Sequence, residues 1–359
     1  MTIILFIAGF VLLIAGAEFL VRGASKIATY AGLSKLVIGL TVVAYGTSFP
    51  ELVVSSIGSI TGQTDIAVGS VVGSNIFNIL CVLGISAIIL PLYISRDLIR
   101  LDVPIMIFVS VIMLLFSIDG VISRFESIFL LTLGFVYTWW VIKTGKKESK
   151  HEDFNSGEKK ILMEKKWKSL SSSIFYVLIG LGLLIIGSRW LVNGAAYIAR
   201  SMGVSELIVA LVLVAAGTSL PEAATSIIAA IRKERDIAVG NLIGSNIFNI
   251  IFVLGFSGIV ATDTIKISSA ALKFDIPVMV AVSFACLPVF FTGERIARWE
   301  GAIFVGYYLA YTLYLVLTAR QHSSLTIFNE IMLSFIIPLT LLTLLVTLLR
   351  SVRKKAKKQ

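Results

Sequence analysis

Two short polar motifs interrupt long apolar segments of the chain, and each motif occurs twice. Gly46–Glu51 reads GTSFPE and returns as GTSLPE at Gly217–Glu222, while GSNIFN occupies both Gly73–Asn78 and Gly244–Asn249. Each copy therefore places a carboxylate, hydroxyls and amides among apolar residues. Ionisable side chains in such segments are costly, and they usually belong to a functional site. The duplication favours one site assembled from both copies.

The chemistry that these residues could perform is the binding of a hard cation. Pro50 and Pro221 each remove a backbone donor, which leaves upstream carbonyls free for other partners. Cages of oxygen atoms suit Ca²⁺, whereas zinc and softer metals prefer nitrogen or sulfur. Two carboxylates balance one Ca²⁺ or two Na⁺, so these ions can compete for one site. The candidate ligands are the carboxylates of Glu51 and Glu222, the hydroxyls of Thr47, Ser48, Ser74, Thr218, Ser219 and Ser245, the amides of Asn78 and Asn249, and freed carbonyls that include those of Ala44 and Ala215.

The elements that must position these residues are membrane-spanning helices. Of the 359 residues, 57% are hydrophobic and only 14% are charged, whereas a soluble domain carries about a quarter charged residues. A helix of about 20 apolar residues crosses the hydrocarbon of a bilayer. Asp65, Asp102, Asp236 and Asp275 stand near the starts of such segments, and we expect them to cap helices. The apolar pattern predicts eleven spans, at residues 3–21, 37–61, 66–92, 101–118, 125–142, 171–194, 205–231, 237–261, 274–292, 300–318 and 326–349.

An internal repeat organises these spans. A shift of 171 residues aligns Gly46–Gly84 with Gly217–Gly255, with 23 identities in 39 positions. Because each copy contains five spans, an odd number, the second copy enters the membrane from the opposite side. Inverted repeats of this kind are typical of secondary transporters. We therefore predict an all-α polytopic membrane protein with ten core helices, divided into a first repeat (1–142), a basic cytoplasmic linker (143–170), a second repeat (171–320), and an extra helix with a basic tail (321–359).

The positive charge of the chain agrees with this topology. The formal net charge is +10, and 25 of the 31 lysines and arginines fall on one side of the membrane if the N-terminus lies outside. The positive-inside rule makes that side the cytoplasm, so the C-terminus is expected there too. No aromatic–basic interleaving accompanies the charge, which argues against nucleic-acid binding. Cys81 and Cys286 lie inside spans and do not indicate a disulfide framework.

The paired motifs resemble the α-repeats of the cation/calcium antiporter superfamily, in particular its prokaryotic sodium/calcium exchanger branch. GTSFPE with GSNIFN, repeated as GTSLPE with GSNIFN, carries this resemblance, which extends over both halves. It implies a fold in which the second, third, seventh and eighth helices bind the ions while the first and sixth slide across them. It also implies a plasma-membrane antiporter with Ca²⁺ and Na⁺ as substrates, no cofactor and no obligate protein partner.

The resemblance also implies roles for individual residues. Glu51 and Glu222 would be the carboxylates that Ca²⁺ and Na⁺ share, and Thr47 and Thr218 would offer backbone oxygens to Ca²⁺. Several family members have aspartate at the position of Asn249, so asparagine here leaves two formal negative charges and implies exchange that does not require potassium. The eleventh span is a second departure, because the family pattern has ten helices. The sodium sites would be completed by Ser48, Ser74, Ser219 and Ser245 with the carbonyls of Ala44 and Ala215, while Asn78 and Asn249 would line the middle of the site.

Other functions stay open on the residues alone. The same fold could run H⁺/Ca²⁺ exchange with two carboxylates as proton carriers, although the hydroxyl-rich motifs favour Na⁺. Channels usually build their filters from rings of identical subunits or loops, which an inverted repeat does not provide. An intramembrane serine protease would need a base, and the two histidines, His151 and His322, fall outside the predicted spans. We therefore expect a transporter rather than an enzyme.

Overall fold

The computed structural model describes residues 2–148, 159–204, 215–291, 294–322 and 324–341, together with positions 209, 343 and 345. For residues 146–148, 159–169, 215 and 335 it describes the backbone alone. The middle of the predicted linker, most of the first half of the predicted span 205–231 and the basic tail therefore lie outside the described residues.

The first half is built from helices that are interrupted by π-helical segments, labelled η. These elements are α1 (Thr2–Ala31), α2 (Lys35–Ile38), η1 (Gly39–Val43), α3 (Ala44–Thr47), α4 (Phe49–Ile60), α5 (Thr64–Ile76), η2 (Phe77–Leu83), α6 (Gly84–Ile89), β1 (Leu92–Tyr93), η3 (Leu98–Asp102), α7 (Val103–Phe116), β2 (Val121–Ile122) and α8 (Arg124–Glu148).

The second half repeats this order. Its elements are α9 (Lys159–Ser201), α11 (Ala215–Gly217), α12 (Leu220–Ile231), α13 (Arg235–Phe248), η6 (Asn249–Leu254), α14 (Gly255–Val260), β3 (Ile265–Lys266), η7 (Ala271–Asp275), α15 (Ile276–Phe291), β4 (Arg295–Ile296), α16 (Arg298–Ala319), α17 (Ser324–Ile331) and η8 (Met332–Ile336).

The bounds of the elements show that the sequence repeat is also a structural repeat. Adding 171 to the bounds of α4 and α6 gives those of α12 and α14. The π-helical segments η2 and η6 also follow α5 and α13 at corresponding places. The predicted all-α polytopic fold with two inverted five-helix repeats is confirmed.

The predicted spans correspond to helices in the described part of the chain. Nine helices there are long and apolar enough to cross a membrane, and residues 35–60 form a tenth span bent by 45° between α3 and α4. The remaining prediction, 205–231, is described mainly in its second half, where α12 is a short apolar helix. At the edges of the predicted linker 143–170, α8 continues to Glu148 and α9 starts at Lys159.

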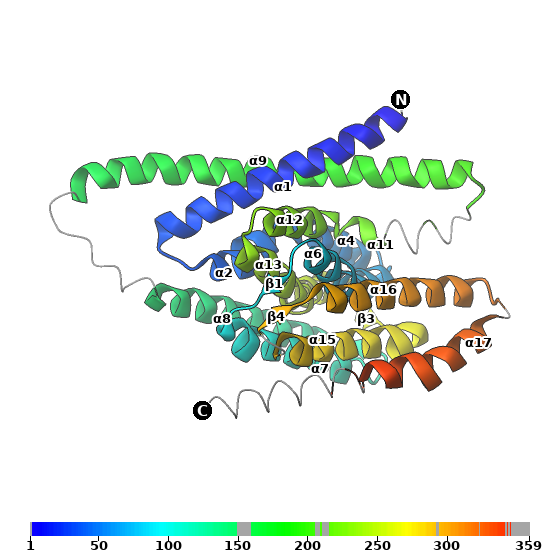
Figure 1. Cartoon of the computed structure of the whole chain (residues 1–359). Helices are drawn as coiled ribbons and strands as arrows, with labels where there is room; N and C mark the ends of the chain where they lie inside the picture. The colour runs from blue at the N-terminus through cyan, green and yellow to red at the C-terminus, as the bar shows by residue number, and fades with distance from the viewer. Residues whose placement is uncertain are drawn as a thin grey trace.

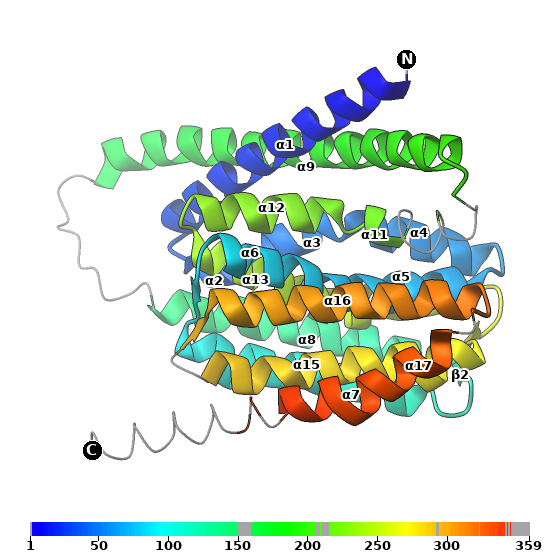
Figure 2. The ribbon, with the colours of Figure 1, turned by 45° about the vertical axis from the view of Figure 1, so that its right-hand side comes forward.

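The helices form layers around a centre made of the short elements. Figure 1 shows α1 and α9 crossing the molecule together as one outer layer above α12. Figure 2, turned by 45°, keeps α12, α13, α5 and α6 between this layer and the group formed by α7, α8, α15 and α16, with α17 at the edge. No residue of α17 is buried. The eleventh span is therefore peripheral to the ten core helices.

The outer helices α1 and α9 approach one another closely because glycines line their contact. A Cβ atom on Gly16 would lie 2.8 Å from the carbonyl oxygen of Gly180, and one on Gly187 would lie 2.8 Å from the amide nitrogen of Leu13. Backbone atoms at this distance cannot move aside as a flexible side chain could. Small residues allow such backbone contact between membrane helices. The pair α1–α9 is therefore held as one unit.

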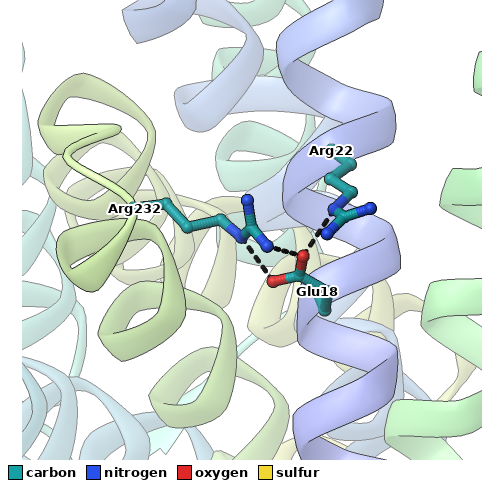
Figure 3. A network of polar contacts seen from close by, with 3 residues as sticks. All are labelled: Glu18, Arg22 and Arg232. Atoms are coloured by element: carbon teal, nitrogen blue, oxygen red, sulfur yellow. Dashed lines mark hydrogen bonds and ion pairs between the residues drawn. The ribbon is translucent and has the colours of Figure 1, made fainter.

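An ion-pair network joins α1 of this outer layer to the end of α12 in the layer beneath (Figure 3). Glu18 on α1 accepts hydrogen bonds from Arg232, which directly follows α12, and it also pairs with Arg22 one turn along α1. These side chains are partly exposed. Glu18 thus contributes to the contact between layers and lies outside the polar cluster described below.

The four aspartates that were expected to cap helices do not do so, which corrects the sequence-based expectation. The N-cap residues of α5 and α13 are Gln63 and Glu234, and neither bonds a backbone amide through its side chain. Asp102 and Asp275 end π-helical segments that continue directly into α7 and α15, so the amides there already have helical partners. Their carboxylates instead accept hydrogen bonds at corresponding places, from Tyr137 at 3.1 Å and from Tyr311 at 2.9 Å.

Candidate ion-binding site

The first polar motif breaks its helix at a serine in each half. Ser48 separates α3 from α4 with φ −84° and ψ 8°, and Ser219 adopts φ −89° and ψ 7° before α12. Pro50 follows within the first turn of α4 and cannot donate to the carbonyl of Gly46, four residues earlier. The carbonyl of Ala44, which was expected to be freed, instead accepts a hydrogen bond from Ser48 N at 3.0 Å. Glu51 and Glu222 then fall in the first turns of α4 and α12. A helix N-terminus favours negative charge, so the break places each carboxylate where its charge is best tolerated.

Glu51 is fully buried and is held by serines from both halves. Its Oε1 accepts hydrogen bonds from Ser219 Oγ at 2.9 Å and from Ser74 Oγ at 3.2 Å. The two serine oxygens lie 2.7 Å apart. Its Oε2 is buried and has no hydrogen-bond partner among the described residues. One oxygen is thus fixed in place while the other stays available.

Glu222 is held in the corresponding way. Its Oε1 accepts a hydrogen bond from Ser48 Oγ at 2.7 Å, and its Oε2 is buried without a partner in the described part of the chain. Ser245 Oγ lies 3.5 Å from the carbonyl oxygen of Ala44, which it can reach as a weak donor. Each carboxylate is therefore fixed by a serine from the opposite half. Neither half of the chain can form this arrangement alone.

Four asparagines connect the second motifs at the contact between α5–η2 and α13–η6. Asn75 Nδ2 donates to the carbonyl oxygen of Asn246 at 3.2 Å, and Asn246 Nδ2 donates to that of Asn75 at 3.3 Å. Asn78 and Asn249 each donate to the side-chain oxygen of the asparagine across the contact, at 3.1 Å in both cases. This leaves Oδ1 of Asn78 and of Asn249 buried and without a partner within the described ranges.

Within the described part of the chain, four acceptor atoms of this region are thus buried without donors: two carboxylate oxygens and two amide oxygens. They come from α4, α12, η2 and η6, two from each half. Burying an acceptor without a partner costs free energy, so the arrangement calls for an electropositive species. The described residues contain no group of three or more His, Cys, Asp or Glu side chains suited to a metal ion. The donor set consists of oxygen atoms and fits a hard cation such as Ca²⁺ or Na⁺.

The structure places nearly all of the predicted site residues inside this region. Ala215 begins α11, but its side chain lies outside the described residues, and Thr218 is half-buried. The other predicted residues are fully buried, namely Glu51, Glu222, Thr47, Ser48, Ser219, Ser74, Ser245, Asn78, Asn249 and Ala44.

Asn241 is a buried polar residue of this region that sequence reasoning missed. Asn241 Oδ1 accepts a hydrogen bond from Thr47 Oγ1 at 3.2 Å, so it contacts the first motif directly. The sequence did contain a signal for this residue: its counterpart in the repeat, 171 residues earlier, is Ser70, so the two copies differ at this position. A comparison of identities alone passes over such a position.

Inverted repeats around a buried site lined with oxygen atoms define a secondary transporter. The chain belongs to the family described as sodium/calcium exchanger protein, which it matches over residues 1–143 and 172–317. It is therefore a cation antiporter of the calcium-exchanger class.

Relatives and solved structures agree with this placement. The chain is 38% identical to the putative antiporter CaxA of Alkalimonas amylolytica over 308 residues, which cover 84% of this chain and 95% of the relative. It is 31% identical to the sodium/calcium exchanger MaX1 of Methanosarcina acetivorans, covering 81% of this chain and 91% of that protein. A structure of the sodium–calcium exchanger NCX_Mj superposes with a TM-score of 0.73 at 31% identity, covering 86% and 96% of the two chains.

Proposed function

We propose that this protein exports Ca²⁺ in exchange for Na⁺ by alternating access at the site between α4, α5, α12 and α13. The observation that carries the proposal is the set of four buried acceptor atoms that lack donors among the described residues. A cation can satisfy several acceptors at once. The sodium/calcium exchangers MaX1 and NCX_Mj, to which the chain is similar, support Ca²⁺ and Na⁺ as the two substrates.

The charge of the site supports competition between the two ions. Glu51 and Glu222 bring two formal negative charges, which one Ca²⁺ or two Na⁺ would neutralise. Asn249 donates to Asn75 and adds no charge, so the site has no third carboxylate among the residues that the structure describes. We therefore propose exchange that does not require potassium. Because both ions use the same two carboxylates, binding of one would release the other.

The serines favour Na⁺ over H⁺ as the coupling ion. A proton carrier needs only a carboxylate, whereas Na⁺ needs several neutral oxygens around it. Ser74 and Ser219 lie beside Glu51, and Ser48 lies beside Glu222, each with its hydroxyl oxygen within hydrogen-bond distance of the carboxylate. These hydroxyls can turn their lone pairs to a cation that binds next to the carboxylate. Exchange of H⁺ for Ca²⁺ through the same two carboxylates is the alternative.

The proposed orientation follows from the basic loops. The side of the membrane that carries most of the lysines and arginines is the cytoplasm by the positive-inside rule. This places the N-terminus outside and the C-terminus inside. Plasma membrane is the proposed location, and a relative named inner membrane protein YrbG, from Escherichia coli, supports it at 36% identity over 71% of this chain.

The test is uptake of ⁴⁵Ca²⁺ into proteoliposomes that are loaded with Na⁺ and diluted into Na⁺-free buffer. We expect uptake that requires internal Na⁺ and does not require potassium. Glu51→Gln and Glu222→Gln should each abolish it, because one remaining charge cannot balance Ca²⁺. Asp263→Asn is the matched control, since this carboxylate is exposed in the turn before β3 and should not affect uptake.

Two results would contradict the proposal. Uptake that a pH gradient drives equally well in sodium-free buffer would assign the protein to H⁺/Ca²⁺ exchange. Sodium-driven uptake that persists in both glutamine variants would show that the ions bind elsewhere.

A further inference from the structure

Asn241 breaks the two-fold correspondence of the site. It lies on α13 and is fully buried, whereas the corresponding residue on α5 is Ser70. Ser74 and Ser245, one turn further along the same two helices, are identical in both halves. The two halves of the site therefore differ at the position of Asn241 and Ser70, whereas the neighbouring serine is the same in both.

The carboxamide of Asn241 connects three elements. Its Oδ1 accepts a hydrogen bond from Thr47 Oγ1 on α3 at 3.2 Å, and its Nδ2 donates to Ser226 Oγ on α12 at 2.9 Å. The same Nδ2 lies 3.5 Å from the carbonyl oxygen of Glu222. Asn241 thus contacts Thr47, which precedes the helix break of the first half, and the turn of the second half that carries Glu222.

The other half has no such connection among the described residues. The counterparts of Asn241 and Ser226 are Ser70 and Ser55, and the side-chain oxygens of both are buried without a hydrogen-bond partner in the described structure. A serine hydroxyl is attached directly to Cβ, so it is too short to bridge two helices as a carboxamide does. Among the described residues, the network therefore exists in the Glu222 half and has no equivalent in the Glu51 half.

The consequence for cation binding concerns the carbonyl oxygen of Ala44. Three donors surround this atom: Ser48 N at 3.0 Å, Thr47 Oγ1 at 3.3 Å and Ser245 Oγ at 3.5 Å. A threonine hydroxyl has one hydrogen, and Asn241 offers that hydrogen a second acceptor at 3.2 Å. When Thr47 donates to Asn241, the amide of Ser48 is the remaining close donor to the Ala44 carbonyl, and the contact from Ser245 Oγ at 3.5 Å is weak enough for a cation to replace it on the second lone pair.

We propose that Asn241 is a positioning residue that draws the Thr47 hydroxyl away from the Ala44 carbonyl and so increases the Na⁺ affinity of the half of the site that contains Ala44 and Glu222. This inference rests on the proposed function. This half binds Na⁺ more tightly than it would without Asn241, because the Ala44 carbonyl is kept available before the ion arrives. Preorganisation of this kind increases affinity without adding a ligand.

The test is the Na⁺ dependence of Ca²⁺ flux in Asn241→Ser, which installs the residue of the other half. We expect the half-saturating Na⁺ concentration to rise about three- to tenfold, the change that corresponds to one neutral hydrogen bond. The maximal flux and the half-saturating Ca²⁺ concentration should change by less than twofold. Ser70→Ala is the matched control, because the Ser70 hydroxyl has no partner in the described structure, and the Na⁺ dependence should not change.

A second variant separates this role from simple packing. If Asn241 acts through the Thr47 hydroxyl, the substitution Asn241→Ser should have no further effect once Thr47→Val has removed that hydroxyl. The Thr47→Val/Asn241→Ser double variant is therefore expected to match Thr47→Val alone in its half-saturating Na⁺ concentration. A purely structural role predicts instead that the two effects add.

The outcomes distinguish this inference from the proposed function. If the wild-type protein shows no Na⁺-driven flux, the proposed function fails, and the inference fails with it. If wild-type flux is Na⁺-driven but Asn241→Ser retains the wild-type half-saturating Na⁺ concentration, the inference alone is wrong. Additive effects in the double variant would also overturn it.

Discussion

The asparagine cluster between η2 and η6 gives a prediction that the structure makes quantitative. Asn246→Ala would remove two hydrogen bonds between asparagines, from Asn246 Nδ2 to the Asn75 carbonyl at 3.3 Å and from Asn78 Nδ2 to Asn246 Oδ1 at 3.1 Å, together with a weak one from Asn246 Nδ2 to Met106 Sδ at 3.8 Å. The Asn78 amide would then be buried without its partner, which costs about 1–3 kcal/mol, and the lost contact to the carbonyl costs about 1 kcal/mol. We expect the variant to lose about 2–4 kcal/mol of unfolding free energy.

The assay is chemical denaturation of the purified protein in mixed micelles, arranged as two double-mutant cycles. Asn78 and Asn246 are bonded side chain to side chain, and so are Asn249 and Asn75, both at 3.1 Å. Each of these pairs should show a coupling energy of about 1 kcal/mol, and the two values should agree within about 0.5 kcal/mol. The single variants Asn75→Ala and Asn246→Ala should likewise lose nearly the same amount of unfolding free energy.

The cycles can refute the reasoning in two ways. A coupling energy near zero in either pair would show that the hydrogen bond in that pair contributes nothing to stability. Unequal costs for Asn75→Ala and Asn246→Ala, differing by more than about 1 kcal/mol, would show that the two halves do not contact one another symmetrically here.

Three further predictions concern the packing around the site. Gly16→Ala should lower the unfolding free energy by more than about 1 kcal/mol, because the new Cβ would collide with the backbone of α9. Gly182→Ala is the control in the same denaturation assay and should be neutral or stabilising, because no atom lies within 4 Å of its added Cβ. A double-mutant cycle on Glu18 and Arg232 should give less than about 1 kcal/mol, decreasing with added salt, because the pair is partly exposed; a larger value that salt does not change would contradict this. Tyr137→Phe should cost about 1–3 kcal/mol, because it leaves a buried carboxylate without its hydroxyl donor, and an unchanged denaturation midpoint would show that this hydrogen bond is dispensable.

The parts of the fold that sequence reasoning predicted correctly are those that local composition determines. A proline cannot continue the hydrogen bonding of a helix, so the break before Pro50 could be expected, and the structure has a break at Ser48. The apolar segments similarly predict spans, because about 20 residues are needed to cross the hydrocarbon. The inverted repeat could be predicted because five spans is an odd number. The ligand roles assigned to the site residues stay predictions.

The features that sequence reasoning missed depend on partners that are distant along the chain. Asp102 looked like a helix cap because it stands near the start of an apolar segment, but its carboxylate accepts a hydrogen bond from Tyr137, which is 35 residues away. Asn241 gave no motif at all, because its partner Thr47 is 194 residues away. A local pattern specifies which backbone groups need partners. It does not specify which side chain from another helix will supply them.

The pattern of identity and divergence between the halves follows from the geometry of the site. Glu51 is bonded by Ser219 and Glu222 by Ser48, so each half supplies the donor for the carboxylate of the other. A substitution at either serine would therefore disturb the opposite half, which keeps the motifs alike. Position 241 is different, because its hydrogen bonds to Thr47 and Ser226 are not repeated in the other half. The counterpart, Ser70, has no hydrogen-bond partner for its hydroxyl among the described residues. The site is thus symmetric where the halves bond reciprocally, and it can become asymmetric one helical turn away.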